Sequence, residues 1–496
     1  MHTTEGQSVS EMPVFDLVIR GGTVIDGSRS PRYTADVGVS NGRIAAIGDL
    51  SKHQGKKNLD AAGRIVAPGF IDSHTHDDLA LLARPLMDYK VSQGVTTVVT
   101  GNCGISIAPL KGDTPMPAPL NLLDSDAHVR FERFADYLNA LERAPAAVNV
   151  AAMVGHSTLR ARVMPSLDRC ATSQEVEAMQ EMLAEALAAG AIGMSTGTFY
   201  PVAAAATKEE IIEVGRPLSD AGGIYATHMR DEADGCLDSL EESFEIGREL
   251  GIQVVISHHK LQHPRNFGRS AVTLPRIRQA MQCQCVALDC YPYNASSTML
   301  HIDERRLAGR VMIASSTSHP ECAGQDLDDI AKQWGVDKLE AARRLQPASA
   351  IYFSMDEGDV RNILSFEDTM IGSDGIPVGE RPHPRLWGTF PRVLGHYCRD
   401  VGLFSLETAV WKMTGLTASN FGLRDRGLLR EGLHADIVVF DPDTIHDRAN
   451  YDEPTLQADG IEAVVVNGLL TWQAGQHLGT RNGCLIRRDV GSAPVL

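Results

Sequence analysis

The sequence predicts an α/β protein built on a TIM-like (β/α)8 barrel, with a small β-domain formed from both chain termini and an inserted helical lid. Short apolar runs alternate with amphipathic helical stretches such as Ser173–Ala189 and Lys208–Asp220 through the middle of the chain. Segments with strand-like alternation bracket this region on both sides. A chain of 496 residues also suits one large domain with a smaller companion.

The two ends of the chain read as sheet. Asn41-Gly42 lies between Asp36–Ser40 and Arg43–Ile47, and Asn-Gly between apolar runs is a strong hairpin signal. Further strand-like runs are Phe15–Arg20, Thr23–Asp26, Ala435–Phe440 and Ala463–Asn467. We expect residues 1–66 and 427–496 to pair into one small β-domain.

Residues 67–426 are expected to form the catalytic barrel. Its predicted strands are Arg64–Asp72, Val95–Gly101, Asn149–His156, Ala191–Ser195, Gly223–His228, Gln253–His258, Val286–Tyr291 and Thr369–Asp374. Most of these runs are separated by the length of one βα unit with its loops. The wider gap before the last run predicts an insertion, residues 292–368, which we interpret as a helical lid near the barrel mouth.

Composition narrows the functional class. The formal net charge of −17 disfavours nucleic acid and anionic membranes as partners, although a local cation can still bind an anionic small molecule. Met1–Val14 lacks the pattern of a secretory signal, and nine cysteines without framework spacing favour reduced thiols. We expect a cytoplasmic protein with a small-molecule substrate. The sequence leaves the oligomeric state open and is compatible with a monomer.

Metal-type ligands follow the first two predicted barrel strands. His74 and His76 come directly after the first run, and positions i and i+2 of a strand face the same side. Cys103 ends the second run between Gly101 and Gly104, a poor place for core packing. As a thiolate it would be a strong zinc ligand, although a buried inert thiol is the alternative for a single cysteine.

Three later strands also end in metal-type ligands. The fifth ends at His228, and the sixth ends at His258-His259, of which His258 comes first past the apolar run and is the preferred ligand. Asp374 ends the eighth strand beside Gly375. The carboxyl ends of barrel strands meet at one mouth, so these residues together predict a zinc site.

The ligand order resembles the amidohydrolase superfamily, and the bracketing β-domain extends the likeness to nearly the whole chain. Most binuclear members carry a carboxylated lysine near strand four, whereas Ala191–Gly197 contains no lysine. Cys103 in Gly101–Ser106 instead resembles the D-aminoacylase branch, the N-acyl-D-amino-acid deacylases. Further stretches resembling that branch are Gly155–Arg160, Thr227–Glu232, Ser257–Lys260 and Arg381–Thr389.

The resemblance implies a cofactor arrangement and a set of substrate contacts. It implies one tightly held Zn²⁺ on Cys103, His228 and His258, with a weaker second position near His74, His76 and Asp374. It also implies that Arg385 binds the substrate carboxylate and that Tyr291, Ser297 and Tyr352 contact the substrate. From the residues alone, a structural ion pair for Arg385 and ordinary packing for the tyrosines remain alternatives.

The expected reaction is zinc-dependent hydrolysis of N-acyl-D-amino acids to a carboxylate and a free D-amino acid. Zinc lowers the pKa of bound water, and Asp374 would take a proton from the attacking water and return it to the leaving nitrogen. The D-configuration comes from the resemblance alone.

We expect broad activity on neutral side chains. N-acyl-D-glutamate or N-acyl-D-aspartate is the alternative substrate, for which Lys260 or Arg265 could supply a cation. A cyclic amidohydrolase and a non-catalytic scaffold are weaker alternatives, because the strand-four lysine is absent and every expected ligand position is filled.

Overall fold

The computed structural model describes residues 14–112, 116–123 and 129–488. Residues 1–13 of the polar N-terminal segment and residues 489–496 of the expected β-domain lie outside the described residues. Within the described part of the chain, no helix has both the length and the apolar character needed to cross a membrane.

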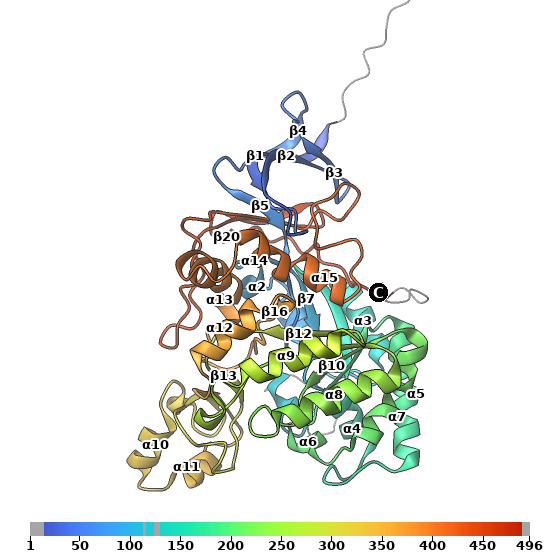
Figure 1. The fold of residues 1–496 in the computed structure, drawn as a ribbon, viewed down its shortest axis with the longest axis vertical. Helices are drawn as coiled ribbons and strands as arrows, with labels where there is room; N and C mark the ends of the chain where they lie inside the picture. Colours follow the sequence, from blue (N-terminus) through green and yellow to red (C-terminus); the bar gives the residue numbers. More distant parts are fainter. Residues whose placement is uncertain (1–13, 113–115, 124–128, 489–496) are drawn as a thin grey trace, which may run out of the picture.

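Eight parallel strands form the central sheet, which confirms the predicted TIM-like barrel (Figure 1). The edge strands β6 and β16 meet through a parallel bridge between Thr75 and Gly375 and through Ser73 N, which donates to Ile371 O at 3.4 Å. The strands are β6 (Phe70–Asp72), β7 (Val95–Thr100), β8 (Asn149–Gly155), β9 (Gly193–Gly197), β10 (Ile224–His228), β11 (Gln253–Ile256), β12 (Val286–Cys290) and β16 (Thr369–Ile371).

Alternation along these strands separates two layers of core. Ile71, Val99, Met153 and Met370 belong to one buried cluster inside the barrel, to which every strand or its immediate flank contributes. The neighbouring residues point to the outer helices. The larger outer helices are α3 (Phe134–Arg143), α5 (Ser173–Ala189), α7 (Lys208–Ala221), α8 (Cys236–Leu250), α9 (Ser270–Met281), α12 (Glu357–Ser365), α13 (Arg385–Arg392) and α14 (Leu406–Met413).

Shorter helical pieces occur along the described chain. They are α1 (Ala80–Ala83), α2 (Asp88–Val91), α4 (His156–Val163), α6 (Pro201–Ala204), α15 (Gly415–Asn420), the 3-10 turns Leu120–Leu123, Pro264–Asn266 and Pro320–Cys322, and the π-helical segment Val393–Asp400.

Both ends of the chain contribute to a second, nine-stranded sheet, drawn at the top of Figure 1. It contains β1 (Phe15–Val24), β2 (Tyr33–Ser40), β3 (Arg43–Gly48), β4 (Gly55–Asp60), β5 (Ile65–Pro68), β17 (Ile437–Phe440), β18 (Ile461–Val466), β19 (Leu469–Gln473) and β20 (Gln476–His477). The central pairing joins β5 of the N-terminal half to β17 of the C-terminal half, antiparallel.

The run predicted as the first barrel strand is divided between the two sheets. Its first half is β5, which pairs with β17, whereas its second half is β6, which pairs with β7. The division falls at Gly69, where a Cβ atom would lie 2.2 Å from a Thr96 side-chain carbon. The barrel therefore begins at Phe70, after a close backbone approach that a larger residue would block.

The insertion after β12 is a mixed α/β unit rather than a purely helical lid. It holds a three-stranded antiparallel sheet of β13 (Ser296–Met299), β15 (Ala348–Tyr352) and β14 (Val311–Ser316). Helices α10 (Leu327–Trp334) and α11 (Lys338–Arg344) pack against that sheet around a separate apolar core. In Figure 1 these helices lie at the end of the molecule away from the β-domain.

A buried lysine contacts polar side chains at the ends of both β6 and β16. Lys90 Nζ lies 2.7 Å from Asp72 Oδ2, 3.3 Å from Asp77 Oδ2 and 2.9 Å from Ser373 Oγ, and all four side chains are buried. Lys90→Met would leave two buried carboxylates without their cation. We expect the free energy of unfolding to fall by about 3–5 kcal/mol, measured by urea denaturation.

The exposed pair of Lys56 and Asp16 provides the control for this prediction. Lys56 Nζ lies 2.8 Å from Asp16 Oδ1, but the Lys56 side chain is 69% exposed. Lys56→Met should lower the free energy of unfolding by less than about 1 kcal/mol. Equal losses in the two variants would refute a special role for the buried lysine.

Candidate active site

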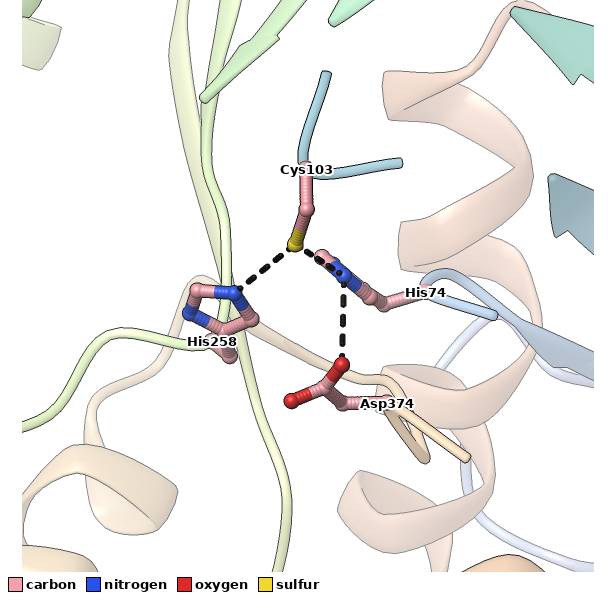
Figure 2. Close-up of side chains that lie close together, drawn as sticks. All are labelled: His74, Cys103, His258 and Asp374. Carbon is pink, nitrogen blue, oxygen red and sulfur yellow. Dashed lines mark hydrogen bonds and ion pairs between the residues drawn. The ribbon is translucent and has the colours of Figure 1, made fainter. Parts of the chain in front are cut away.

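Four predicted ligands converge at the mouth of the barrel (Figure 2). Cys103 Sγ lies 3.2 Å from His258 Nε2 and 3.2 Å from His74 Nε2. Asp374 Oδ1 lies 3.6 Å from His74 Nε2 and 3.2 Å from His76 Nε2. One ligand atom from each of His74, Cys103, His258 and Asp374 falls within 4.8 Å of the others, so this group could hold a metal ion.

The backbone at three of these ligands is strained. Cys103, His258 and Asp374 have φ values of +55°, +36° and +49°, in a region that non-glycine residues rarely occupy. Beside Cys103, a Cβ atom at Gly101 would lie 1.9 Å from Met153 O, so the turn presses closely on β8. Such strain persists where the surrounding fold imposes it, commonly at functional sites, and here it turns the ligands toward the mouth.

A second group of ligands shares His258 with the first. His228 Nε2 lies 3.3 Å from Glu232 Oε2, and His258 Nδ1 lies 3.1 Å from Glu232 Oε1. The two histidine rings are 4.4 Å apart. The structure thus places His74 and Asp374 with Cys103 and His258, whereas it groups His228 with His258 and Glu232. His258 joins the two halves of one continuous site.

The donor set fits zinc. Thiolate, imidazole and carboxylate are the ligands that zinc takes in proteins. The Nδ1 atoms of His228 and His76 are buried without a hydrogen-bond partner among the described residues, which is unusual for polar atoms. Burial raises the pKa of the Cys103 thiol well above its usual range. A bound cation would satisfy the imidazoles and compensate a thiolate.

Glu232 and Lys260 support this site, although sequence reasoning assigned Glu232 no role. Lys260 Nζ lies 2.6 Å from Glu232 Oε1, and both residues are buried. Glu232 Oε1 and Lys260 Nζ lie 3.1 Å and 2.7 Å from His258 Nδ1, so both contact the ring nitrogen opposite the one that faces Cys103 and fix the orientation of the ring. The signal was present, because Glu232 follows His228 by four residues in Thr227–Glu232, but it lies beyond the strand end where ligands were sought.

The predicted carboxylate-binding arginine lies beside the predicted catalytic acid. Arg385 is fully buried, with Nη1 2.9 Å from Asp374 Oδ2 and Nη2 donating to Ser297 O at 3.0 Å. Its guanidinium carbon lies 4.6 Å from the centroid of the Tyr291 ring. Arg385 Nε has no hydrogen-bond partner among the described residues. The structure therefore brings Arg385, Tyr291, Ser297 and Asp374 together.

Tyr352 contributes a ring to the site rather than a free hydroxyl. Its hydroxyl donates to Met299 O and accepts from His301 N, both at 2.9 Å. Tyr352, Ser297, His228 and Asp374 all line a pocket with about 490 Å³ of empty space, part of it open to solvent. This pocket lies between the barrel mouth and the insertion.

The charges around Asp374 keep it ionised. Burial works against ionisation, but Arg385 and the neighbouring histidines hold the pKa of the Asp374 carboxyl well below its usual range. An ionised carboxylate here can bind a cation or accept a proton.

The family model described as the amidohydrolase family matches residues 57–275 and 307–471. The chain belongs to the amidohydrolase family. This amidohydrolase is 61% identical to a D-aminoacylase of Alcaligenes xylosoxydans xylosoxydans, over 95% of this chain and 98% of that protein.

Solved structures agree with this relationship. One solved structure of D-aminoacylase concerns the functional role of the binuclear metal centre in that enzyme. It has 59% sequence identity and a TM-score of 0.94, over 96% of this chain and 100% of that one. An N-acyl-D-glutamate deacylase from Bordetella bronchiseptica, complexed with zinc and a phosphonate mimic of the tetrahedral intermediate, has 47% identity and a TM-score of 0.92 with the same coverage.

Proposed function

We propose that this amidohydrolase hydrolyses N-acyl-D-amino acids to a carboxylate and a free D-amino acid. The convergence of Cys103 with His258, His74 and Asp374, next to the buried Arg385, carries this proposal. The relatives support it, since they are a D-aminoacylase and an N-acyl-D-glutamate deacylase.

We further propose how the ligands are divided. Cys103, His228 and His258 would hold one tight zinc ion, and His74, His76 and Asp374 would hold a weaker second one. The D-aminoacylase structure described above concerns one-metal activation and second-metal attenuation, which supports a single essential ion. When bound, zinc supplies a nucleophile from water at neutral pH and polarises a carbonyl oxygen.

The protein's own residues orient the substrate and move the proton. Arg385 presents a planar guanidinium to the substrate carboxylate, with the Tyr291 ring stacked beneath it. Asp374 accepts a proton from the attacking water and donates it to the leaving nitrogen, which makes the amine a better leaving group. Because Arg385 contacts Asp374 at 2.9 Å, the bound carboxylate would lie close to the proton-transfer group.

An amine-release assay on the zinc-loaded protein tests the proposal. N-acetyl-D-methionine should be hydrolysed faster than its L-enantiomer by more than about 100-fold, because a site that fixes both the carboxylate and the acyl carbonyl positions only one enantiomer for attack. Zinc-loaded protein that releases no amine from any N-acyl-D-amino acid would refute the function. The cytoplasmic location remains a prediction, and the oligomeric state stays open.

A further inference from the structure

One cation in the pocket wall lacks a counter-charge. Arg306 follows β13 in the insertion, is half-buried and lines the pocket. Its guanidinium carbon lies 3.7 Å from the centroid of the Phe199 ring, and Nη2 makes a long hydrogen bond of 3.5 Å to Phe199 O. Nη1 is buried without a hydrogen-bond partner, and no carboxylate of the described residues lies within 4 Å of Arg306.

Lys260 and Arg265, the two cations that could bind an acidic substrate side chain according to the sequence, are both already paired with carboxylates of the protein. Lys260 pairs with the buried Glu232 at 2.6 Å. Arg265 pairs with Asp234 at 2.6 Å and is 63% exposed, and it does not line the pocket. Their positive charges are therefore already balanced by carboxylates of the protein itself.

The carboxylate on the same loop does not neutralise Arg306 either. Asp303 acts on Arg306 at longer range, but its ion pair is with Arg305, at 3.6 Å. Burial lowers the pKa of Arg306, as expected for a guanidinium whose charge lacks compensation.

Arg306 and the proposed metal ligand His228 both contact the ring of Phe199. The Phe199 ring centroid is 4.7 Å from that of His228, and the guanidinium stacks on the same ring. The ring of His301, which is also buried, lies 5.6 Å from Phe199, and its Nε2 has no partner among the described residues. Because His228, His301 and Arg306 line the same pocket, a substrate anchored near His228 would meet the Arg306 guanidinium and the unpaired His301 nitrogen.

We propose that Arg306 binds the side-chain carboxylate of the substrate, so that N-acyl derivatives of acidic D-amino acids are preferred over their uncharged isosteres. This inference rests on the proposed function and selects among its substrates. Arg offers a planar fork that matches a carboxylate, and a charge-assisted pair in a half-buried pocket is stronger than one in water. The short chains of D-aspartate and D-glutamate suit a cation held beside the reaction centre.

Isosteric substrates give the sharpest test. N-acetyl-D-glutamate and N-acetyl-D-glutamine differ in charge but hardly in shape, so their ratio of kcat/KM reports the anion contact. In the zinc-loaded wild type we expect the ratio to favour glutamate. Arg306→Leu should lower the ratio by about 10- to 100-fold, mainly through the KM for N-acetyl-D-glutamate. Arg306→Lys should retain part of the preference because it keeps the charge.

Arg305→Leu provides the matched control, because Arg305 is the adjacent arginine, is 89% exposed and pairs with Asp303. Its ratio should equal that of the wild type. An unchanged ratio in Arg306→Leu, or the same loss in both variants, would overturn the proposal, as would equal losses for both substrates.

A binding measurement separates this inference from the proposed function. Calorimetry on the zinc-loaded Asp374→Asn protein would compare the affinities of N-acetyl-D-glutamate and N-acetyl-D-glutamine, with and without Arg306→Leu. If the wild type hydrolyses no N-acyl-D-amino acid, the proposed function fails, but an Arg306-dependent preference for the glutamate derivative still supports the subsite. Equal affinities would overturn the subsite whatever the activity.

Discussion

Replacing Cys103 with alanine should remove the tightly bound zinc and lower kcat/KM by more than about 1000-fold, because the nucleophile would no longer be generated at neutral pH. The sulfur lies 3.2 Å from nitrogens of both His74 and His258, so its loss removes the atom that joins the ligands of two strand ends. Zinc per chain after dialysis and kcat/KM for N-acetyl-D-methionine measure the two effects.

Cys322→Ala provides the control for this prediction. Cys322 is also buried, but it packs in the apolar core of the insertion, apart from the ligand groups. This variant should keep its zinc. A Cys103→Ala protein that retained one zinc ion and normal turnover would refute the thiolate as a ligand.

Asp374→Asn should lower kcat by about 100- to 10,000-fold while the protein keeps the zinc that we propose Cys103, His228 and His258 hold. The amide has nearly the same shape as the carboxylate, so the turn after β16 should be preserved. It cannot accept the proton from water, and it leaves Arg385 without its ion pair at 2.9 Å. Metal analysis together with steady-state kinetics separates lost proton transfer from lost metal.

Asp441→Asn in the β-domain is the comparison for this change. Asp441 is buried and pairs with Arg64 at 3.1 Å. It belongs to neither group of possible metal ligands, so its replacement should leave kcat close to that of the wild type. Near-normal turnover by Asp374→Asn with zinc bound would contradict the proposed proton-transfer role.

Local pattern was enough to predict the barrel and the metal-type side chains that gather at its mouth. Parallel strands in a closed barrel are apolar on both faces and end at one mouth, so polar residues just past them could be located by counting. Neighbouring residues of a strand point to opposite sides, so only one of His258 and His259 was expected to face the site, and His258 was preferred because it comes first past the apolar run. His258 faces Cys103, whereas His259 Nε2 lies 2.8 Å from Thr273 Oγ1 on the outer helix α9.

Other features depend on contacts between distant segments. The insertion was expected to be helical, but its strands pair antiparallel over a separation of tens of residues, which no local period reveals. The division of the first strand at Gly69 likewise depends on Thr96, a residue of the neighbouring strand.

By itself the sequence determined the fold class and which residues could bind a metal, because both follow from periodicity and from the chemistry of side chains at strand ends. The tertiary structure alone decided which charges neutralise one another. Lys260 and Arg385 have carboxylate partners, whereas Arg306 has none within 4 Å among the described residues. Ion pairing depends on distances of a few ångströms between remote parts of the chain, and sequence separation carries no such information.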